Sequence, residues 1–216
     1  MSLFVDELYN WINNNRPNVS VTKSDISIIE DVANYFGLNP KWLANLINFE
    51  SGFNTKAINR SSNATGLIQF MPSTARSLGT SVSELYSMSF AEQMQYVKKY
   101  IYNNYKQLKW IDNNGKPLKN KASQIDLFMM IFYPVAVGNE NYPFPEKVVK
   151  ANSGIATPKD YFNRAVQSAP FKKIIEISMA AQKFARKNIV PIIVISFFGM
   201  AIIGTVLYLV IKKKIK

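Results

Sequence analysis

The segment at residues 189–211 constrains the fold of this chain more than any other feature. It runs for 23 residues without a charged side chain. A helix of that length rises about 34 Å, enough to cross the hydrocarbon core of a bilayer. Tyr208 lies near one end, where aromatic side chains often meet the membrane surface. We therefore predict a transmembrane helix, because the alternative, a buried core helix, rarely continues this long without a charge.

Basic residues flank this segment on both sides. The chain has a net charge of +12, and residues 171–216 hold nine Lys or Arg against one acid, Glu176, which accounts for +8 of that total. Basic side chains gathered around an apolar run favour a lipid surface, so we expect no nucleic-acid partner. The flanking residues are Lys183, Arg186 and Lys187 on one side and Lys212, Lys213, Lys214 and Lys216 on the other.

The pattern divides the chain into five parts. We expect an N-terminal helical extension at 1–22, a main domain at 23–170, a basic amphipathic linker helix at 171–188, the transmembrane helix at 189–211 and a basic tail at 212–216. The first residues contain Asp6 and Glu7 and no uninterrupted apolar stretch, so no signal peptide is expected. The apolar segment would then be a single-pass C-terminal anchor, whose orientation the basic residues at both ends leave open.

The chain contains no cysteine and no histidine. It therefore cannot build a Ser-His or Cys-His nucleophile pair, or a zinc site with imidazole or thiolate ligands. Catalysis must rest on carboxylates, Lys, Tyr, Ser, Thr or backbone groups. We expect neither a metal nor an organic cofactor.

The main domain is predicted to be mainly α, because helix-start signals recur and few segments alternate with period two. Ser24 or Asp25 can cap one helix, and Asn39 followed by Pro40 is typical of another helix start. The expected helices run over 1–15, up to Phe36, over 40–50, from Pro72, from the capping box at Ser89, over 125–133 and from Pro158, with a loop at 52–64.

Glu50 continues the apolar side of the helix expected over 40–50. Leu43, Leu46 and Ile47 line that side, and Glu50 falls at the next position of the same stripe. It also lies at the helix C-terminus, where the helix dipole is negative. Loss of water and the dipole both raise the pKa of a carboxyl group, as a general acid near neutral pH requires. The alternative is a glutamate that points into solvent.

Two motifs begin at this glutamate. Residues 50–54 read Glu-Ser-Gly-Phe-Asn, and residues 66–75 read Gly-Leu-Ile-Gln-Phe-Met-Pro-Ser-Thr-Ala. They resemble the lytic transglycosylase family with the lysozyme-like fold, in which a catalytic Glu-Ser is followed by a loop and by Gly-Leu-Met-Gln before a helix that begins with Pro. Ile68 replaces the usual Met. The resemblance covers about 28–105 and implies a lysozyme-like transglycosylase domain at 23–170.

A third motif of the family, Ala-Tyr-Asn-x-Gly, is altered in this chain. Residues 132–138 read Phe-Tyr-Pro-Val-Ala-Val-Gly, so Tyr133 takes the place of the motif tyrosine and the Asn is missing. This is similar to a variant in phage-type members. The alternative for Tyr133 is a core aromatic residue at a helix end.

The resemblance implies cleavage of the β-1,4 bond between N-acetylmuramic acid and N-acetylglucosamine in peptidoglycan. Glu50 would protonate the glycosidic oxygen and then accept a proton from the muramic C6 hydroxyl, which closes a 1,6-anhydro ring. Ser51 could instead only cap a turn, and Gln69 could only bridge backbone groups. The substrate-binding residues that the resemblance implies are Ser51, Gly66, Ile68, Gln69 and Tyr133, with Gly66 and Ile68 acting through the backbone.

Residues 51–83 contain no Asp or Glu. Ordinary glycosidases use two carboxylates, so this gap fits a mechanism with a single one. Asp112, Asp126 or Glu140 could still fold back toward Glu50, and a hydrolysing muramidase is therefore the first alternative. The second is an inactive, membrane-anchored glycan-binding or structural virion protein. A holin-like membrane-lesion protein is disfavoured by the large motif-bearing domain.

A tail-anchored domain made in the cytoplasm conflicts with a substrate in the periplasm. An enzyme held in the internal membrane of a virus particle resolves the conflict, because it meets the cell wall as the virus enters the cell. We therefore expect a phage virion membrane protein whose partners are peptidoglycan strands, the bilayer through 189–211, and capsid or membrane proteins of the virion. The alternative is the bacterial inner membrane, with the domain in the periplasm and residues 212–216 inside.

Overall fold

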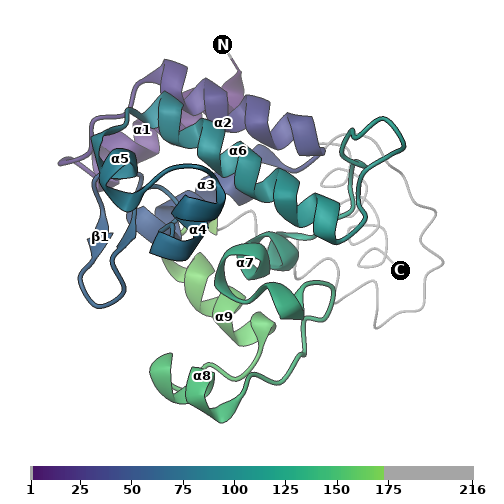
Figure 1. Cartoon of the computed structure of the whole chain (residues 1–216). Helices are drawn as coiled ribbons and strands as arrows, with labels where there is room; N and C mark the ends of the chain where they lie inside the picture. Colours follow the sequence, from purple (N-terminus) through teal and green to yellow (C-terminus); the bar gives the residue numbers. More distant parts are fainter. Residues whose placement is uncertain (1, 173–216) are drawn as a thin grey trace, which may run out of the picture. The chain divides into compact units, whose positions relative to one another are not determined.

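A computed structural model describes residues 2–172 of the chain, and helices dominate this part, as the sequence predicted (Figure 1). The elements, in chain order, are α1 (Leu3–Asn15), α2 (Lys23–Phe36), α3 (Pro40–Ser51), β1 (Ile58–Asn59), β2 (Ala64–Thr65), α4 (Pro72–Ser77), α5 (Val82–Ser87), α6 (Phe90–Gln107), α7 (Gln124–Phe132), the 3-10 turn η1 (Pro134–Ala136), α8 (Glu146–Ala151), α9 (Pro158–Ala165) and the 3-10 turn η2 (Val166–Ser168).

Side-chain caps fix many of the helix starts. The capping box expected at Ser89 is present, where the Ser89 hydroxyl and the Glu92 carboxylate each accept from a backbone N–H of the other residue. The start of α2 was placed at Ser24 or Asp25, and this was wrong. Thr22 is the cap, and Asp25, three residues later, completes the box. That spacing lets the two residues satisfy each other's backbone N–H groups, which the start of a helix otherwise leaves without partners.

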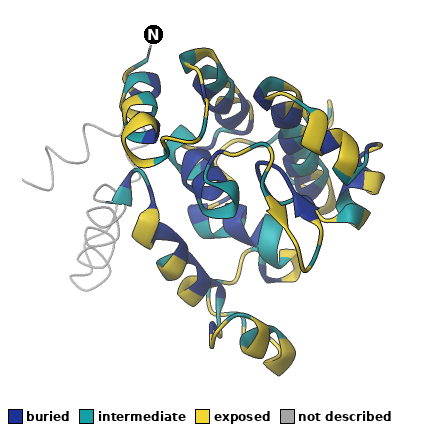
Figure 2. Ribbon diagram, turned by 90° about the vertical axis from the view of Figure 1, so that its left-hand side faces the viewer, coloured by how far each residue is buried: buried dark blue, intermediate teal, exposed yellow. Residues whose placement is uncertain are grey.

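Helix α3 occupies the centre of the fold. It packs against α2, α7, α9 and η2, and the residues from Leu43 to Asn48 are all buried. The buried sides of the helices face one another, and their exposed sides face outward (Figure 2). Helices on several sides therefore fix the C-terminal end of α3, which carries Glu50.

Helix α7 is the apolar helix that the sequence placed inside the domain. Its residues Leu127, Phe128, Met129 and Met130 are buried, and it contacts both α3 and α9. It begins and ends one residue before the expected bounds, so that Tyr133 is its C-cap. Its position beside α3 brings the altered third motif to the same side of the domain as α9.

The expected loop at 52–64 contains a short hairpin. Strand β1 pairs antiparallel with β2, with Ile58 opposite Thr65 and Asn59 opposite Ala64. An isolated bridge then joins Thr65 to Phe70, so the chain between them makes a tight turn. This turn contains Gly66 and Gln69, and the hairpin holds it at a fixed place in the fold.

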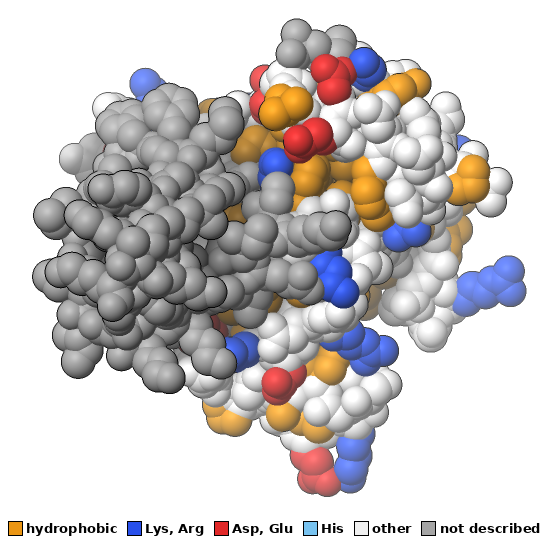
Figure 3. Space-filling view, turned by 180° about the vertical axis from the view of Figure 1, so that it is seen from behind, with side chains coloured by type: hydrophobic (Ala, Val, Ile, Leu, Met, Phe, Trp, Pro, Cys, Tyr) orange, Lys and Arg blue, Asp and Glu red, His pale blue; other side chains and the backbone are white. Residues whose placement is uncertain are grey.

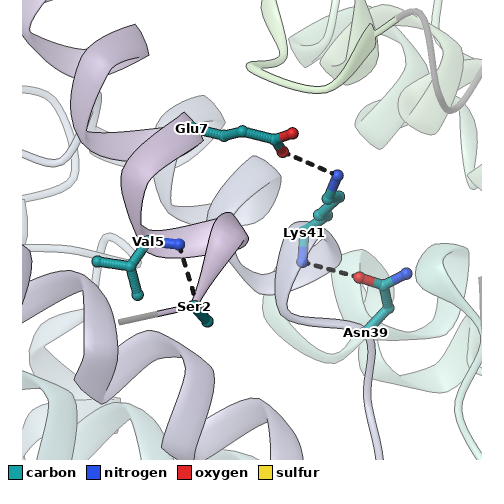
Figure 4. Close-up of polar contacts among 5 residues, drawn as sticks. All are labelled: Ser2, Val5, Glu7, Asn39 and Lys41. Atoms are coloured by element: carbon teal, nitrogen blue, oxygen red, sulfur yellow. Dashed lines mark hydrogen bonds and ion pairs between the residues drawn. The ribbon is translucent and has the colours of Figure 1, made fainter.

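The N-terminal helix α1 packs on α2 and lies in the same compact unit as the other helices. The Ser2 hydroxyl accepts from the Val5 N–H at 3.3 Å and begins α1 (Figure 4). Lys41 of α3 donates to Glu7 at 3.1 Å, and its own backbone N–H donates to the Asn39 cap at 3.0 Å. An ion pair at the surface contributes little by itself. Most of the packing therefore comes from the buried side chains of α1, which are Phe4, Val5, Leu8 and Ile12.

Within residues 2–172, no helix combines the length and the hydropathy needed to span a bilayer. The predicted transmembrane helix (189–211), the basic tail (212–216) and all but the start of the linker helix (171–188) lie outside the described residues. On the described part of the face in Figure 3, basic side chains are scattered and interspersed with acidic and apolar ones.

Candidate active site

Glu50 lies in the last turn of α3, as the sequence predicted. Asn39 caps this helix, Pro40 is its first residue, and Gly52 ends it in the left-handed conformation with φ of +60°. Leu46 and Ile47 on the preceding turn are fully buried, whereas Glu50 itself is partly exposed. The helix therefore carries the carboxyl group from the core to the edge of the protein interior, where it is partly exposed.

The surroundings of Glu50 favour its protonated form. Burial raises the pKa of Glu50 from its ordinary 4.5 to about 7, and a hydrogen bond from Tyr161 opposes this rise. Burial is one of the two causes expected from the sequence, and it dominates. Glu50 therefore exchanges its proton near neutral pH, as a group that serves first as acid and then as base requires.

The partner of Glu50 is Tyr161, which the sequence did not point to. The Tyr161 hydroxyl donates to Glu50 Oε1 over 3.4 Å, and the tyrosine is buried in α9. Its ring stacks on Phe132 at 4.0 Å between centroids and meets Phe49 edge-on at 5.4 Å. Burial and the charge of Glu50 both raise the pKa of Tyr161, so this tyrosine stays a proton-bearing donor. The sequence predicted only the helix that carries Tyr161, from its start at Pro158, and not the contact with Glu50.

Ser51 connects the end of α3 to the turn that carries the second motif. Its hydroxyl lies 2.9 Å from the Leu67 carbonyl and 3.1 Å from the Ile47 carbonyl, and it can donate to either. These two bonds join Ser51 to the preceding turn of its own helix and to the second motif, and neither is the turn cap considered as the alternative for Ser51. Because Ser51 is still partly exposed, its oxygen remains able to accept a bond from a substrate.

The buried side chain of Gln93, in α6, holds the turn at 66–69 by hydrogen bonds. Nothing in the sequence pointed to this residue. The fully buried Gln93 accepts from the Leu67 N–H at 2.9 Å and donates to the carbonyls of Thr55 and Leu85 at 2.8 and 2.6 Å. Gly66 has φ of +81°, and a Cβ there would lie 2.4 Å from Gln93 Oε1. Only glycine fits that close approach.

The side chain of Gln69 is partly exposed, whereas that of Ile68 is buried. The Gln69 amide donates to the carbonyls of Gly66 at 3.1 Å and Ala57 at 3.3 Å, so it bridges backbone groups while remaining partly exposed. The Ile68 side chain is buried, so a substrate can meet only its backbone. Gln69 has φ of +52°, a conformation that L-residues rarely adopt, and the hairpin and Gln93 together hold the turn in place.

Tyr133 is separated from Tyr161, the partner of Glu50, by the ring of Phe132. It is partly exposed at the end of α7, and its ring lies 6.5 Å from that of Phe132, which stacks on Tyr161. Tyr133 also contacts Phe144 at 5.2 Å and Tyr142 at 5.9 Å. It is therefore not a fully buried core residue, and a chain of ring contacts through Phe132 connects it to Tyr161.

Two of the acids considered as a second carboxylate are engaged elsewhere. Asp126 accepts from Ser123 in the cap of α7 and from the Gly138 N–H at 2.6 Å. Asp112 accepts from the N–H groups of Asn114 and Lys116 in its own turn. Among residues 2–172 no carboxylate contributes to the pKa shift of Glu50, and no group of three or more acids could hold a metal ion.

The last turns of α3 are also hydrogen-bonded to the residue that follows α1 and to the 3-10 turn η2. Arg16, just after α1, donates to the Asn48 side-chain oxygen at 2.9 Å, and the Asn48 amide donates to the Ser168 carbonyl at 3.0 Å. Asn48 is buried and lies two residues before Glu50. These bonds fix the turn of α3 that carries the carboxyl group.

This geometry agrees with a comparison of the chain with known families. Residues 27–119 match the family model of the transglycosylase SLT domain. The match supports the lytic transglycosylase family and, with it, enzymatic cleavage of peptidoglycan. It covers less than half of the chain and includes Glu50, Ser51, the turn at 66–69 and Gln93, whereas Tyr133 and Tyr161 lie beyond it. No solved structure matches the chain.

Replacing Tyr161 with phenylalanine is expected to move the alkaline limb of the pH–rate profile to higher pH. A lytic transglycosylase needs a protonated acid in its first step, so cleavage should fall as the pH rises through about 7, the pKa of Glu50. The Tyr161 hydroxyl lowers that pKa, and its loss raises it. Initial rates of muropeptide release across this pH range measure the midpoint.

Tyr102→Phe is the matched control, because it removes a tyrosine hydroxyl that donates to the Gly115 carbonyl at 2.9 Å rather than to Glu50. Its profile should keep the native midpoint. An unchanged midpoint in Tyr161→Phe would contradict the role of Tyr161 in setting the pKa of Glu50.

Proposed function

We propose that this protein is a peptidoglycan lytic transglycosylase in which Glu50 is the single catalytic carboxyl group. It cleaves the β-1,4 bond between N-acetylmuramic acid and N-acetylglucosamine and leaves a 1,6-anhydro product. The observation that carries the proposal is a partly exposed Glu50 with a pKa of about 7, next to the Ser51 and 66–69 motifs. The SLT match over 27–119, which includes these motifs, supports the same assignment.

The pKa of Glu50 suits both halves of this reaction. The protonated carboxyl donates its proton to the glycosidic oxygen as that bond breaks. The carboxylate left behind takes the proton of the muramic C6 hydroxyl, whose oxygen forms the new bond to the anomeric carbon. Glu50 thus ends as it began, and no water is consumed. Tyr161, donating at 3.4 Å, stabilises the carboxylate between the two steps.

The residues of the two motifs position the glycan strand in this proposal. Gln69 and Ser51 are partly exposed, Ser51 directly follows Glu50, and Gln93 holds the turn that contains Gly66 and Ile68 through the Leu67 N–H. Rigid donors and acceptors lose little freedom when substrate binds. Tyr133 contributes an aromatic surface further along.

The product distinguishes this proposal from its alternatives. Purified peptidoglycan digested with the full-length protein should release muropeptides one water lighter than the reducing form, as mass spectrometry would show. Reducing ends would identify a hydrolysing muramidase, in which water replaces the C6 hydroxyl. Intact peptidoglycan, bound but not cleaved, would identify an inactive glycan-binding protein. Either result would overturn the transglycosylase assignment.

We also propose that residues 189–211 anchor the enzyme in a bilayer, namely the internal membrane of a phage particle. The charge-free length and the basic flanks support the anchor, and the altered third motif supports a phage setting. Detection of the protein in purified membrane-containing virions, and its release from them by detergent, is the expected result. Its presence only in envelopes of uninfected bacteria would favour the bacterial inner membrane instead.

A further inference from the structure

A line of aromatic side chains leads away from Glu50 into a part of the chain beyond the SLT match. We call it the aromatic track. From Tyr161, the partner of Glu50, it continues to Phe132 at 4.0 Å, then to Phe144 at 5.6 Å and Tyr133 at 6.5 Å. It ends at Tyr142, whose ring centroid lies 5.9 Å from that of Tyr133. Neighbouring rings in contact thus extend continuously from the carboxyl group to Tyr142.

The track has a buried side and an accessible side. Phe144 is buried and contacts Phe132, Tyr133 and Tyr142, so it supports the other rings from within. Tyr133 and Tyr142 are partly exposed. Val135, two residues after Tyr133, is 74% exposed. This end of the track therefore presents apolar surface and phenol groups to the solvent.

The segment that carries Tyr142 is hydrogen-bonded to the first turn of α9 and to the residues just before that helix. The Phe144 N–H donates to the Ala156 carbonyl at 2.8 Å, and the Lys159 N–H donates to the Glu140 carbonyl at 3.0 Å. The Tyr142 N–H closes a turn with the Asn139 carbonyl at 3.1 Å. Tyr142 is therefore held in place relative to α9 and Tyr161, and little ordering is needed when a ligand binds.

These properties suit a pyranose ring. The face of a β-linked sugar is a patch of C–H groups that packs on an aromatic ring, and its rim of hydroxyls can bond to a phenol oxygen. A tyrosine offers both an apolar body and a polar tip. The two accessible tyrosine rings of the track, Tyr133 and Tyr142, lie 5.9 Å apart and so match a ligand that repeats along its length, as a glycan strand does.

We infer that Tyr142 forms a distal saccharide subsite, which holds a glycan strand beyond the sugars cleaved at Glu50. This inference rests on the proposed function and extends it, since it places part of the substrate recognition in residues 139–144, outside the SLT match. Tyr142 acts as a binding residue that favours long strands over short ones and takes no part in the chemistry. Tyr133 lies between the subsite and Tyr161.

Binding of chitooligosaccharides of increasing length to the full-length Glu50→Gln variant tests the subsite without turnover. These β-1,4-linked N-acetylglucosamine oligomers share the backbone of the proposed substrate. Calorimetric affinity should rise with length until Tyr142 is covered. Adding Tyr142→Ala should weaken the longest oligomers about tenfold and leave the shortest unchanged. Tyr142→Phe should retain most of the increase in affinity with oligomer length, since phenylalanine keeps the aromatic ring.

Two controls separate binding from folding. Tyr142→Leu keeps much of the apolar volume without an aromatic face and should lose affinity as Tyr142→Ala does, with an unchanged melting temperature. Tyr35→Ala removes another exposed tyrosine, on α2, and should bind all lengths like the parent. Equal affinities of the parent and Tyr142→Ala at every length would overturn the subsite, as would no binding at any length. The proposed function fails separately, when native protein leaves peptidoglycan uncleaved.

Discussion

Replacing Glu50 with glutamine is expected to lower the rate of peptidoglycan cleavage by about 1,000-fold or more, because both proton transfers are lost. Glutamine has nearly the same shape and can still accept a bond from Tyr161. It cannot donate a proton to the leaving oxygen or take one from the C6 hydroxyl. Release of soluble muropeptides at about pH 6, where most Glu50 is protonated, measures the loss. Activity close to that of the native protein would remove Glu50 from the catalytic role.

The stability of the same variant shows whether it is folded. The pKa of Glu50 is raised in the folded protein, from 4.5 to about 7, so the folded state holds its proton longer than the unfolded state. Below about pH 4.5 both states are protonated and the carboxyl group carries no penalty. As the pH rises toward 7 the unfolded state ionises first. The free energy of unfolding of the native protein therefore falls by on the order of 3 kcal/mol.

Glu50→Gln never ionises and escapes this loss. It should match the native protein in urea unfolding below about pH 4.5 and exceed it above about pH 7. A gap that stays the same at every pH would show that burial of Glu50 does not set its pKa. An active site that weakens its own fold in this way is a common compromise between function and stability.

The residues around α3 show what the sequence can predict. Asn39, Pro40 and Gly52 are local signals for helix ends, and the apolar stripe ending at Glu50 gives the direction of its side chain. From these we predicted that the carboxyl group lies at the end of the helix, and the structure confirms this. The same pattern left a glutamate that points into solvent as the alternative, and the burial that raises the pKa of Glu50 argues against it. Such predictions succeed because they depend on neighbours three or four residues apart.

Contacts between distant segments were not predictable in the same way. Tyr161 meets Glu50 across 111 positions of the chain, and Gln93 meets Leu67 across 26. Each looks like an ordinary helix residue in the sequence, since only the packing of α9 and α6 around α3 brings it to the site. Short elements such as α5, α8 and the β1–β2 hairpin were also not predicted, because segments of this length are stable only through tertiary contacts.

Replacing Gln93 with leucine is expected to destabilise the protein by about 4 kcal/mol. The change leaves the Leu67 N–H and the carbonyls of Thr55 and Leu85 without their present partner inside the protein, and each unpaired group costs about 1–3 kcal/mol. Urea unfolding measures this loss. Cleavage should also fall, since the turn at 66–69 is no longer held behind the motif residues.

Gln95→Leu is the matched control, because it makes the same substitution two residues further along α6 at an exposed position. It should change the unfolding free energy by less than about 0.5 kcal/mol and leave cleavage intact. Equal effects of the two substitutions would show that the bonds of Gln93 do not hold the turn. If Gln93→Leu alone loses stability and activity, the ordering of the motif depends on α6, although none of the motif residues belongs to that helix.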